Sequence, residues 1–235
     1  MYHGKTAVIC QCRTSSRRLR NKLFLKVKNK PIIYYLIKRL EKINCDDIIF
    51  AIAEECGKNK LFKLIKGISP SSKFFFGSKE NVLDRTIKSA EKFNISKIIR
   101  ITSDCPLIDP NIVNKGISKS KKINFDYLSN NMIKSFPHGL DFEIVSLEAL
   151  KKSMILCKDK RNFEHVTWYI KRSKLFKKVN IANKNDKEKK IRLTLDYKTD
   201  YQLIKCLIEK YPIIVKDFDK STLCKIYYAH LSKKK

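Results

Sequence analysis

Basic side chains are concentrated in one short polar segment, residues 13–22, which directly follows the apolar run at residues 6–12. Four of the ten arginines in the chain lie between positions 13 and 20, beside Ser15 and Ser16, and Lys22 closes the segment. Guanidinium, ammonium and hydroxyl groups gathered on one turn are suitable donors for a polyphosphate. The alternative is an exposed basic turn without a ligand. The segment therefore indicates a phosphate-binding loop.

Two aspartates follow apolar runs elsewhere in this basic chain. Asp104 lies three positions after the run at residues 97–101, and Asp196 directly follows the run at residues 191–195. Mg²⁺ is commonly held by one or two carboxylates together with substrate phosphates. Two such aspartates facing a basic loop would form a site for metal-assisted phosphoryl or nucleotidyl transfer. Asp109 is instead expected to cap a helix that begins at Pro110.

The elements that must position these residues alternate between strand and helix. Continuous apolar strands are typical of a parallel sheet with both faces covered, so the pattern predicts a mostly parallel, doubly wound α/β fold. Ligands bind beyond the carboxyl ends of such strands, where the basic loop and Asp104 fall. Strands are predicted at 6–12, 47–53, 73–76, 97–101, 126–128, 140–145, 176–181 and 191–195. Helices are predicted at 31–43, 59–66, 81–93, 147–157, 164–173, 198–210 and 219–231.

The composition fits one globular domain spanning residues 1–235. The chain is 43% hydrophobic and 32% charged, which excludes disorder throughout, and its formal net charge is +29. Such a charge is typical of proteins that bind a polyanion. Only ten of the 52 basic residues are arginine, however, and the lysines are dispersed among many isoleucines and asparagines. A compositional bias toward lysine therefore explains much of the surplus, and a nucleic-acid partner is not favoured.

The eight cysteines include no Cys-x-x-Cys pair and no neighbouring histidine cluster, which argues against a zinc site. Cys10 and Cys12 alternate along the first predicted strand and are expected to pack in the core. No signal peptide and no apolar run long enough to span a bilayer is evident. We therefore expect a cytoplasmic protein without a membrane partner.

Six segments, taken together, resemble one enzyme family: the sugar-activating cytidylyltransferases, especially the SpsF-like spore coat polysaccharide branch, which are relatives of CMP-sugar-acid synthetases. Residues 8–22 look like the strand and the Arg-x-x-Ser-x-Arg-Leu-Pro-Gly-Lys loop of that family. Residues 77–85, 100–109, 137–143, 164–167 and 193–196 then match further family segments in the same order. Each segment alone is a weak signal. The resemblance is specific because all six follow the order of the family along nearly the whole chain.

The resemblance implies a Rossmann-like glycosyltransferase-A (nucleotide-diphospho-sugar transferase) fold and a Mg²⁺-dependent reaction. CMP would pass from CTP to a sugar acid or sugar phosphate, with pyrophosphate release, for surface polysaccharide or glycan biosynthesis. Residues 1–125 would form the nucleotide-binding half. Residues 126–235 would form the sugar-binding half, through which relatives commonly form a homodimer. A sugar-1-phosphate nucleotidyltransferase that uses another nucleotide is the alternative within the enzyme class, and a basic nucleic-acid-binding protein is the alternative outside it.

The resemblance also assigns roles by position. Arg13, Lys22 and Asp104 would be catalytic, and Asp104 and Asp196 would bind the metal ion. The nucleotide-binding residues would be Gln11, Arg13, Ser16, Arg18, Lys22, Arg85 and Ser103. The sugar-binding residues would be His138, Asp141, Glu143 and His165. His138 stands where relatives often carry arginine, and His165 is either a general base or a core histidine bonded to the backbone.

The basic loop departs from the family pattern at two places. Ser15 replaces a glycine, and Arg20 and Asn21 replace Pro-Gly. Glycine lets backbone amides approach a phosphate closely, so a side chain at position 15 could obstruct binding. Asn21 tolerates left-handed backbone angles better than most residues, which favours a preserved turn. Extra arginine side chains could compensate, and a weakly active enzyme is the alternative.

Overall fold

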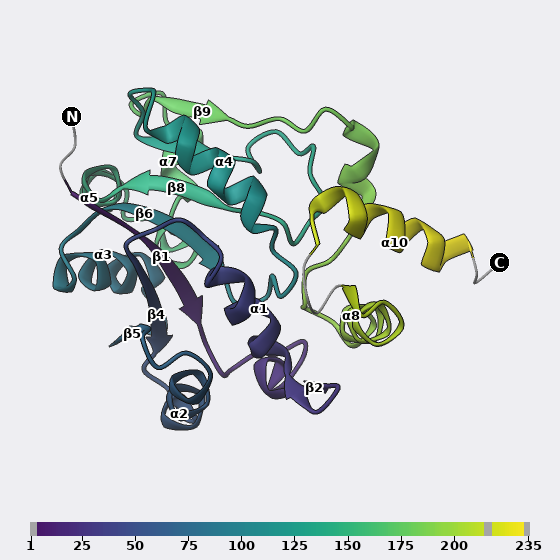
Figure 1. Ribbon diagram of the computed structural model, residues 1–235. Helices are drawn as coiled ribbons and strands as arrows, with labels where there is room; N and C mark the ends of the chain where they lie inside the picture. The colour runs from purple at the N-terminus through teal and green to yellow at the C-terminus, as the bar shows by residue number, and fades with distance from the viewer. Residues whose placement is uncertain (1–3, 214–217, 233–235) are drawn as a thin grey trace.

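A central β-sheet with helices on both faces forms the body of the computed structural model (Figure 1). The structure describes residues 4–213 and 218–232. The seven strands are ordered β5-β4-β1-β6-β8-β7-β9. Their bounds are β1 (Lys5–Cys12), β4 (Asp47–Ala53), β5 (Lys73–Gly77), β6 (Ile95–Thr102), β7 (Tyr127–Ser129), β8 (Glu143–Ser146) and β9 (Lys178–Asn180). A separate small hairpin pairs β2 (Lys26–Val27) with β3 (Lys30–Pro31).

The sheet is mostly parallel, as the sequence predicts. Strands β5, β4, β1 and β6 run in one direction. Strand β8 is antiparallel to both of its neighbours, β6 and β7, whereas β9 runs parallel to β7. The carboxyl ends of the first four strands therefore lie at one edge of the sheet, which is where an open α/β sheet binds its ligands.

Alternate strand residues face two separate hydrophobic cores, which confirms the doubly wound architecture. Val8 and Cys10 pack on the side of α1, α2, α4, α8 and α10, whereas Ala7 and Ile9 pack on the side of α3, α5 and α7. The helices are α1 (Ile32–Leu40), α2 (Lys58–Ile68), α3 (Val82–Lys92), α4 (Pro110–Ser120), α5 (Leu147–Leu156), α6 (Lys160–His165), α7 (Trp168–Arg172), α8 (Lys198–Lys210) and α10 (Lys220–Ser232). The short 3-10 helices are η1 (Lys22–Phe24) and η2 (Asp186–Lys190).

Several local predictions are confirmed. Cys10 and Cys12 are buried in the core. The Asp109 carboxylate caps α4 by accepting a hydrogen bond from the backbone N–H of Asn111, and Pro110 is the first helical residue. Asn21 adopts the left-handed conformation, with φ of 53°, so asparagine does preserve the turn after the basic loop.

Two predicted elements differ in the structure. The predicted helix at residues 164–173 is divided, because the backbone of Val166 has φ of +58° and separates α6 from α7. The predicted strand at 191–195 is not a sheet strand. Its backbone bonds to two loops, with Leu193 N–H donating to the carbonyl of His138 and Leu195 N–H to that of Asp104. This segment therefore extends from the loop at His138 to the loop at Asp104 instead of joining the sheet.

Within the described ranges, no helix has the length and apolar character required to span a bilayer.

Candidate active site

The Lys22 side chain connects the basic loop to both predicted metal-binding aspartates. Lys22 begins η1 and is 7% exposed. Its Nζ donates to the carbonyl of Leu195 at 2.8 Å and lies 3.2 Å from Asp196 Oδ1 and 3.4 Å from Asp104 Oδ2. The tertiary structure thus brings together three residues that the sequence singled out separately.

Asp104 follows β6 and is held as a carboxylate. Burial raises the pKa of Asp104, but the Lys22 ammonium and a hydrogen bond from Thr102 Oγ1 outweigh it, so the pKa lies below its ordinary value. The Asp104 carbonyl accepts hydrogen bonds from Leu195 N–H at 2.8 Å and from Thr194 Oγ1 at 3.2 Å. The segment that carries Asp196 is therefore fixed directly against the Asp104 loop.

Asp196 is surrounded by cations. Arg18 Nη2 lies 2.9 Å from Asp196 Oδ1, and Arg192 Nη2 lies 3.5 Å from Oδ2, in addition to Lys22. The Arg18 guanidinium also lies over the Tyr197 ring, 5.0 Å from its centroid. Asp200 supports the arrangement by accepting hydrogen bonds from the backbone N–H groups of Asp196 and Tyr197 at 2.9 and 3.0 Å. In this structure Arg18 thus contacts a predicted metal ligand.

Glu55 anchors the start of the basic loop, a role that the sequence did not reveal. Its carboxylate accepts hydrogen bonds from the backbone N–H and the hydroxyl of both Thr14 and Ser15. Burial raises the pKa of Glu55, but these hydrogen bonds lower it below its ordinary value. The Ser15 hydroxyl, which replaces the family glycine, is thereby bound to Glu55. One sequence signal could have revealed this role. Glu55 lies just after the predicted strand at 47–53, so it falls at the same edge of the sheet as the basic loop.

The other predicted nucleotide-binding residues lie around the ends of β1 and β6 and the start of α3. Gln11 Nε2 donates to Thr86 Oγ1 at 2.9 Å, and Ser103 N–H donates to the carbonyl of Gln11 at 3.2 Å. Arg85 is 2% exposed, and its Nη1 donates to the carbonyl of Ser78. Burial lowers the pKa of Arg85.

Within the described residues, the buried Nε of Arg85 has no hydrogen-bond partner. In the basic loop, Ser16 Oγ accepts a hydrogen bond from Leu19 N–H, and the Arg13 side chain is exposed.

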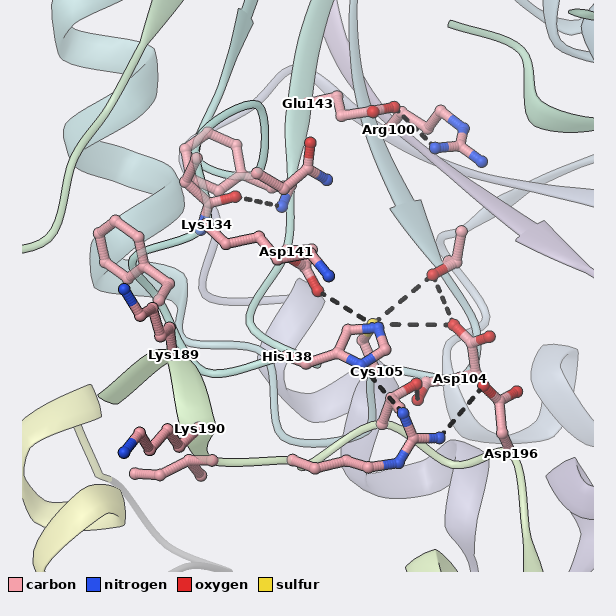
Figure 2. A pocket seen from close by; sticks show the side chains of 18 of the residues that line it. Arg100, Asp104, Cys105, Lys134, His138, Asp141, Glu143, Lys189, Lys190 and Asp196 are labelled. Carbon is pink, nitrogen blue, oxygen red and sulfur yellow. Dashed lines mark hydrogen bonds and ion pairs between the residues drawn. The ribbon is translucent and has the colours of Figure 1, made fainter. Parts of the chain in front are cut away.

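A cavity of about 500 Å³ opens beside the Lys22 cluster, between the ends of the strands and the segments at 130–142 and 189–196 (Figure 2). Asp104 and Asp196 lie at one side of this cavity, with His138 and Asp141 next to them. Its lining residues are Arg100, Thr102, Asp104, Cys105, Asn130, Asn131, Lys134, Phe136, His138, Asp141, Phe142, Glu143, Lys171, Lys189, Lys190, Ile191, Arg192, Thr194 and Asp196.

Gly139 shapes the part of the cavity that holds His138 and Asp141. Its φ is +106°, and a Cβ there would lie 2.5 Å from the backbone carbon of Leu193. Asp141 accepts a hydrogen bond from Gly139 N–H at 2.9 Å and lies 3.9 Å from His138 Nε2. Burial raises the pKa of Asp141. His138 Nδ1 is 3.1 Å from Arg192 Nη1, so this nitrogen accepts the bond and leaves Nε2 directed toward Asp141.

Glu143 is also predicted to bind sugar and forms part of the cavity wall, but it is only 1% exposed. Its carboxylate contacts Arg100 and Lys171, each at 2.6 Å, and accepts hydrogen bonds from the hydroxyls of Tyr127 and Thr167. Burial raises the pKa of Glu143, but the two cations outweigh it and lower the pKa to about 2. Arg100 Nε also donates to Gln11 Oε1, which connects the cavity wall to the nucleotide side.

The structure does not bring His165 to this cavity. His165 is the last residue of α6, its side chain is exposed, and it is absent from the cavity lining. Thr167, two residues later, is the member of that sequence motif whose side chain reaches Glu143. The geometry therefore gives no support to His165 as a general base, nor to the buried core histidine that was its alternative.

The donors around Lys22 fit a magnesium ion. Within residues 4–213 and 218–232, no three His, Cys, Asp or Glu side chains are grouped for a metal ion. Asp104 and Asp196 would nevertheless offer two hard carboxylate ligands, the number that Mg²⁺ usually takes when substrate phosphates and water supply the rest. The Lys22 ammonium contacts both carboxylates and offsets part of their charge.

Comparison with known proteins identifies the family of the chain. A family model described as cytidylyltransferase matches residues 7–229. The chain is 35% identical over 198 residues to an uncharacterized protein of Methanocaldococcus jannaschii, covering 83% of this chain and 79% of that protein. It is 30% identical over 210 residues to the spore coat polysaccharide biosynthesis protein SpsF of Bacillus subtilis, covering 86% and 85%.

Solved structures that share the fold of this chain are also nucleotidyltransferases. A cytidylyltransferase from Leptospira borgpetersenii superposes with a TM-score of 0.91 at 27% identity, covering 98% of this chain and 96% of that one. A CMP:2-keto-3-deoxy-manno-octonic acid synthetase in complex with CTP shares the fold, with a TM-score of 0.65 at 12% identity and coverage of 88% and 99%. The Rossmann-like nucleotidyltransferase fold is thereby confirmed, and with it the enzyme class predicted from the sequence. The chain belongs to the cytidylyltransferase family.

Proposed function

We propose that this enzyme transfers CMP from CTP to a sugar acid or sugar phosphate and releases pyrophosphate. The observation that carries the proposal is the position of Lys22, which joins the basic loop to Asp104 and Asp196 at the edge of a cavity large enough for a sugar. A transferase needs this arrangement, because the triphosphate and the acceptor must meet at the α-phosphorus.

The basic loop and the residues behind it bind the nucleotide. Arg13, Ser16, Arg18 and Lys22 hold the triphosphate, and Gln11, Arg85 and Ser103 contact the rest of CTP. The unpartnered Nε of the buried Arg85 supports this assignment, because a buried donor without a partner is costly unless a ligand pairs with it. Attack by the acceptor oxygen forms a new bond to the α-phosphorus, while the bond from that phosphorus to pyrophosphate breaks.

Asp104 and Asp196 would hold Mg²⁺, which when bound supplies positive charge to the reacting phosphates. The basic side chains of the loop stabilise the negative charge that develops on the departing pyrophosphate. Asp141 has a raised pKa and lies beside His138 in the cavity, so this pair is placed to orient the acceptor hydroxyl and take up its proton.

The similarity to SpsF supports a role in the biosynthesis of a surface polysaccharide or glycan. The enzyme would act in the cytoplasm, where CTP is available, and homodimerisation through residues 126–235 remains a prediction.

The decisive experiment measures pyrophosphate release from each of the four ribonucleoside triphosphates with Mg²⁺, across a panel of sugar acids and sugar phosphates. We expect release with CTP and one class of acceptor, and no release when Mg²⁺ is removed with EDTA. Faster release with another nucleotide would show that this nucleotide, and not CTP, is the donor. No release above the blank with any combination of nucleotide and acceptor would refute the proposal.

A further inference from the structure

Three lysines line the cavity on the side away from the two metal-binding aspartates (Figure 2). We propose that Lys134, Lys189 and Lys190 form a second anion-binding subsite for the acceptor. The acceptor sugar then carries a phosphate or carboxylate group at the end remote from the oxygen that attacks CTP. This inference rests on the proposed transfer to a sugar and specifies the substrate class of the same site.

The distribution of charge around the cavity supports this subsite. Asp104 and Asp196 lie across the cavity from Lys189 and Lys190 in Figure 2, and most of the carboxylate charge in the lining is balanced locally. Glu143 pairs with Arg100 and Lys171, and Asp196 pairs with Arg18, Lys22 and Arg192.

Among the described residues, by contrast, no carboxylate pairs with Lys134 or Lys190. A cavity whose far side is positive in this way favours an anionic ligand.

A partly buried hydrogen-bond network links the two segments that carry these lysines. The Asn183 N–H donates to Ser135 Oγ at 2.9 Å, and Asn183 Nδ2 donates to the Ser135 carbonyl at 3.1 Å. Ser135 directly follows Lys134 and is 5% exposed.

Glu188 holds the other segment. It is 5% exposed, accepts a hydrogen bond from Asn183 Nδ2 at 2.6 Å and forms an ion pair with Lys220 of α10. The Glu188 carbonyl accepts a hydrogen bond from Ile191 N–H at 3.0 Å. This bond joins the residues on either side of Lys189 and Lys190 in a turn. The two lysine backbones are therefore preorganised, which lowers the entropy lost when their side chains bind a ligand.

Three apolar side chains also line the cavity. They are Phe136, Phe142 and Ile191, and the last two are each only 1% exposed. Apolar side chains suit the carbon faces of a sugar ring, which leaves its charged substituent to the lysines. Lysine is a flexible point charge, so the geometry accepts either a carboxylate or a phosphate.

The test compares the wild-type protein with the double variant K134Q/K190Q by isothermal titration calorimetry. The probes are glucose, glucuronate and glucose 6-phosphate, with CTP titrated in parallel. We expect the wild-type protein to bind at least one anionic sugar more tightly than glucose, and the variant to bind that sugar about tenfold or more weakly with its CTP affinity unchanged. The stronger of the two anionic probes identifies the carboxylate or the phosphate as the preferred group.

The control K115Q/K119Q removes the same charge from the exposed face of α4 and should leave sugar binding unchanged. The variant R13Q/R18Q should show the reverse pattern, with CTP binding weakened and sugar binding retained. Equal binding of glucose and the anionic sugars, no binding of either anionic sugar, or unchanged binding by K134Q/K190Q would overturn the subsite. A wild-type protein that does not bind CTP would instead refute the proposed function.

Discussion

Lys22 Nζ and Asp196 Oδ1 lie 3.2 Å apart, although 174 positions separate the two residues in the chain. The ammonium group of Lys22 also contacts Asp104, so one cation lies between two carboxylates that come from different segments. Binding of a metal–nucleotide complex must change these contacts, because the same oxygens would then serve as metal ligands.

Replacing Lys22 by methionine should therefore affect two measurable properties. We expect kcat/KM for CTP to fall about 100-fold or more, since the lysine also contacts the triphosphate in our proposal. Mg²⁺ alone should raise the melting temperature of the variant more than that of the wild-type enzyme, because Asp104 loses its ion pair and Asp196 loses one of its three cations. Lys26→Met, at an exposed position of β2, is the control, and an equal response to Mg²⁺ in both proteins would contradict the arrangement.

Asp104→Asn tests the metal assignment. The amide keeps the shape of the side chain and removes its charge, so we expect kcat to fall about 1000-fold while the circular dichroism spectrum stays unchanged. Asp84→Asn, a change of the same kind on α3, should retain normal turnover. Wild-type activity in Asp104→Asn would show that this carboxylate does not bind the metal.

Glu55→Ala removes the anchor of the basic loop. Thr14 and Ser15 lose four hydrogen bonds, so the loop should become less ordered and the KM for CTP should rise about tenfold, with a smaller change in kcat. The neighbouring Glu54 pairs with Lys58 at the surface, and Glu54→Ala should leave KM unaltered. Steady-state kinetics at varied CTP concentration separates the two variants.

Gly139→Ala should destabilise the fold. The positive φ and the approach of the new Cβ to the Leu193 backbone predict a loss of about 2–4 kcal/mol in the free energy of unfolding. Gly67 lies in α2, where an added Cβ would meet no atom within 4 Å, so Gly67→Ala should stabilise the protein by about 0.5–1 kcal/mol. Urea denaturation of both variants measures the difference, and equal effects would contradict this explanation.

The Glu143 carboxylate should give the fold a specific acid sensitivity. Its pKa is about 2 in the folded protein and 4.5 in the absence of the surrounding structure, so its stabilising effect is fully present above about pH 4.5 and is lost as the pH falls toward 2. The shift corresponds to about 3 kcal/mol. At neutral pH the free energy of unfolding of Glu143→Gln should therefore be lower than that of the wild-type protein. It should also depend less on pH between about 4.5 and 2. Glu148→Gln, at the exposed start of α5, should keep the wild-type profile.

Much of the fold and part of the site could be predicted from the sequence, because they depend on local patterns. Apolar runs bounded by polar turns located β1, β4, β5 and β6, since strands of a parallel sheet covered on both faces are rich in apolar side chains. The clustering of arginine before Lys22 located the basic loop. Asp104 was found because it lies two positions after a strand whose end must lie at the ligand-binding edge.

The segment at 191–195 shows why one predicted strand was wrong. Its apolar residues are buried, as in a strand, but their backbone groups bond to the loops at His138 and Asp104, which lie far away in the sequence. Periodicity reports burial and carries no information about the hydrogen-bond partner. The same limit explains His165, whose motif matched while its side chain lies outside the cavity.

The sequence by itself determined the alternation of strands and helices, the basic loop and the identity of the two aspartates, because each is a property of neighbouring residues. Only the tertiary structure decided which of these residues meet. It placed Lys22 between Asp104 and Asp196, bound Ser15 to Glu55, and assembled Lys134, Lys189 and Lys190 on one side of the cavity. The physical reason is that side-chain charges and hydrogen bonds act over a few ångströms in space, whatever the separation along the chain.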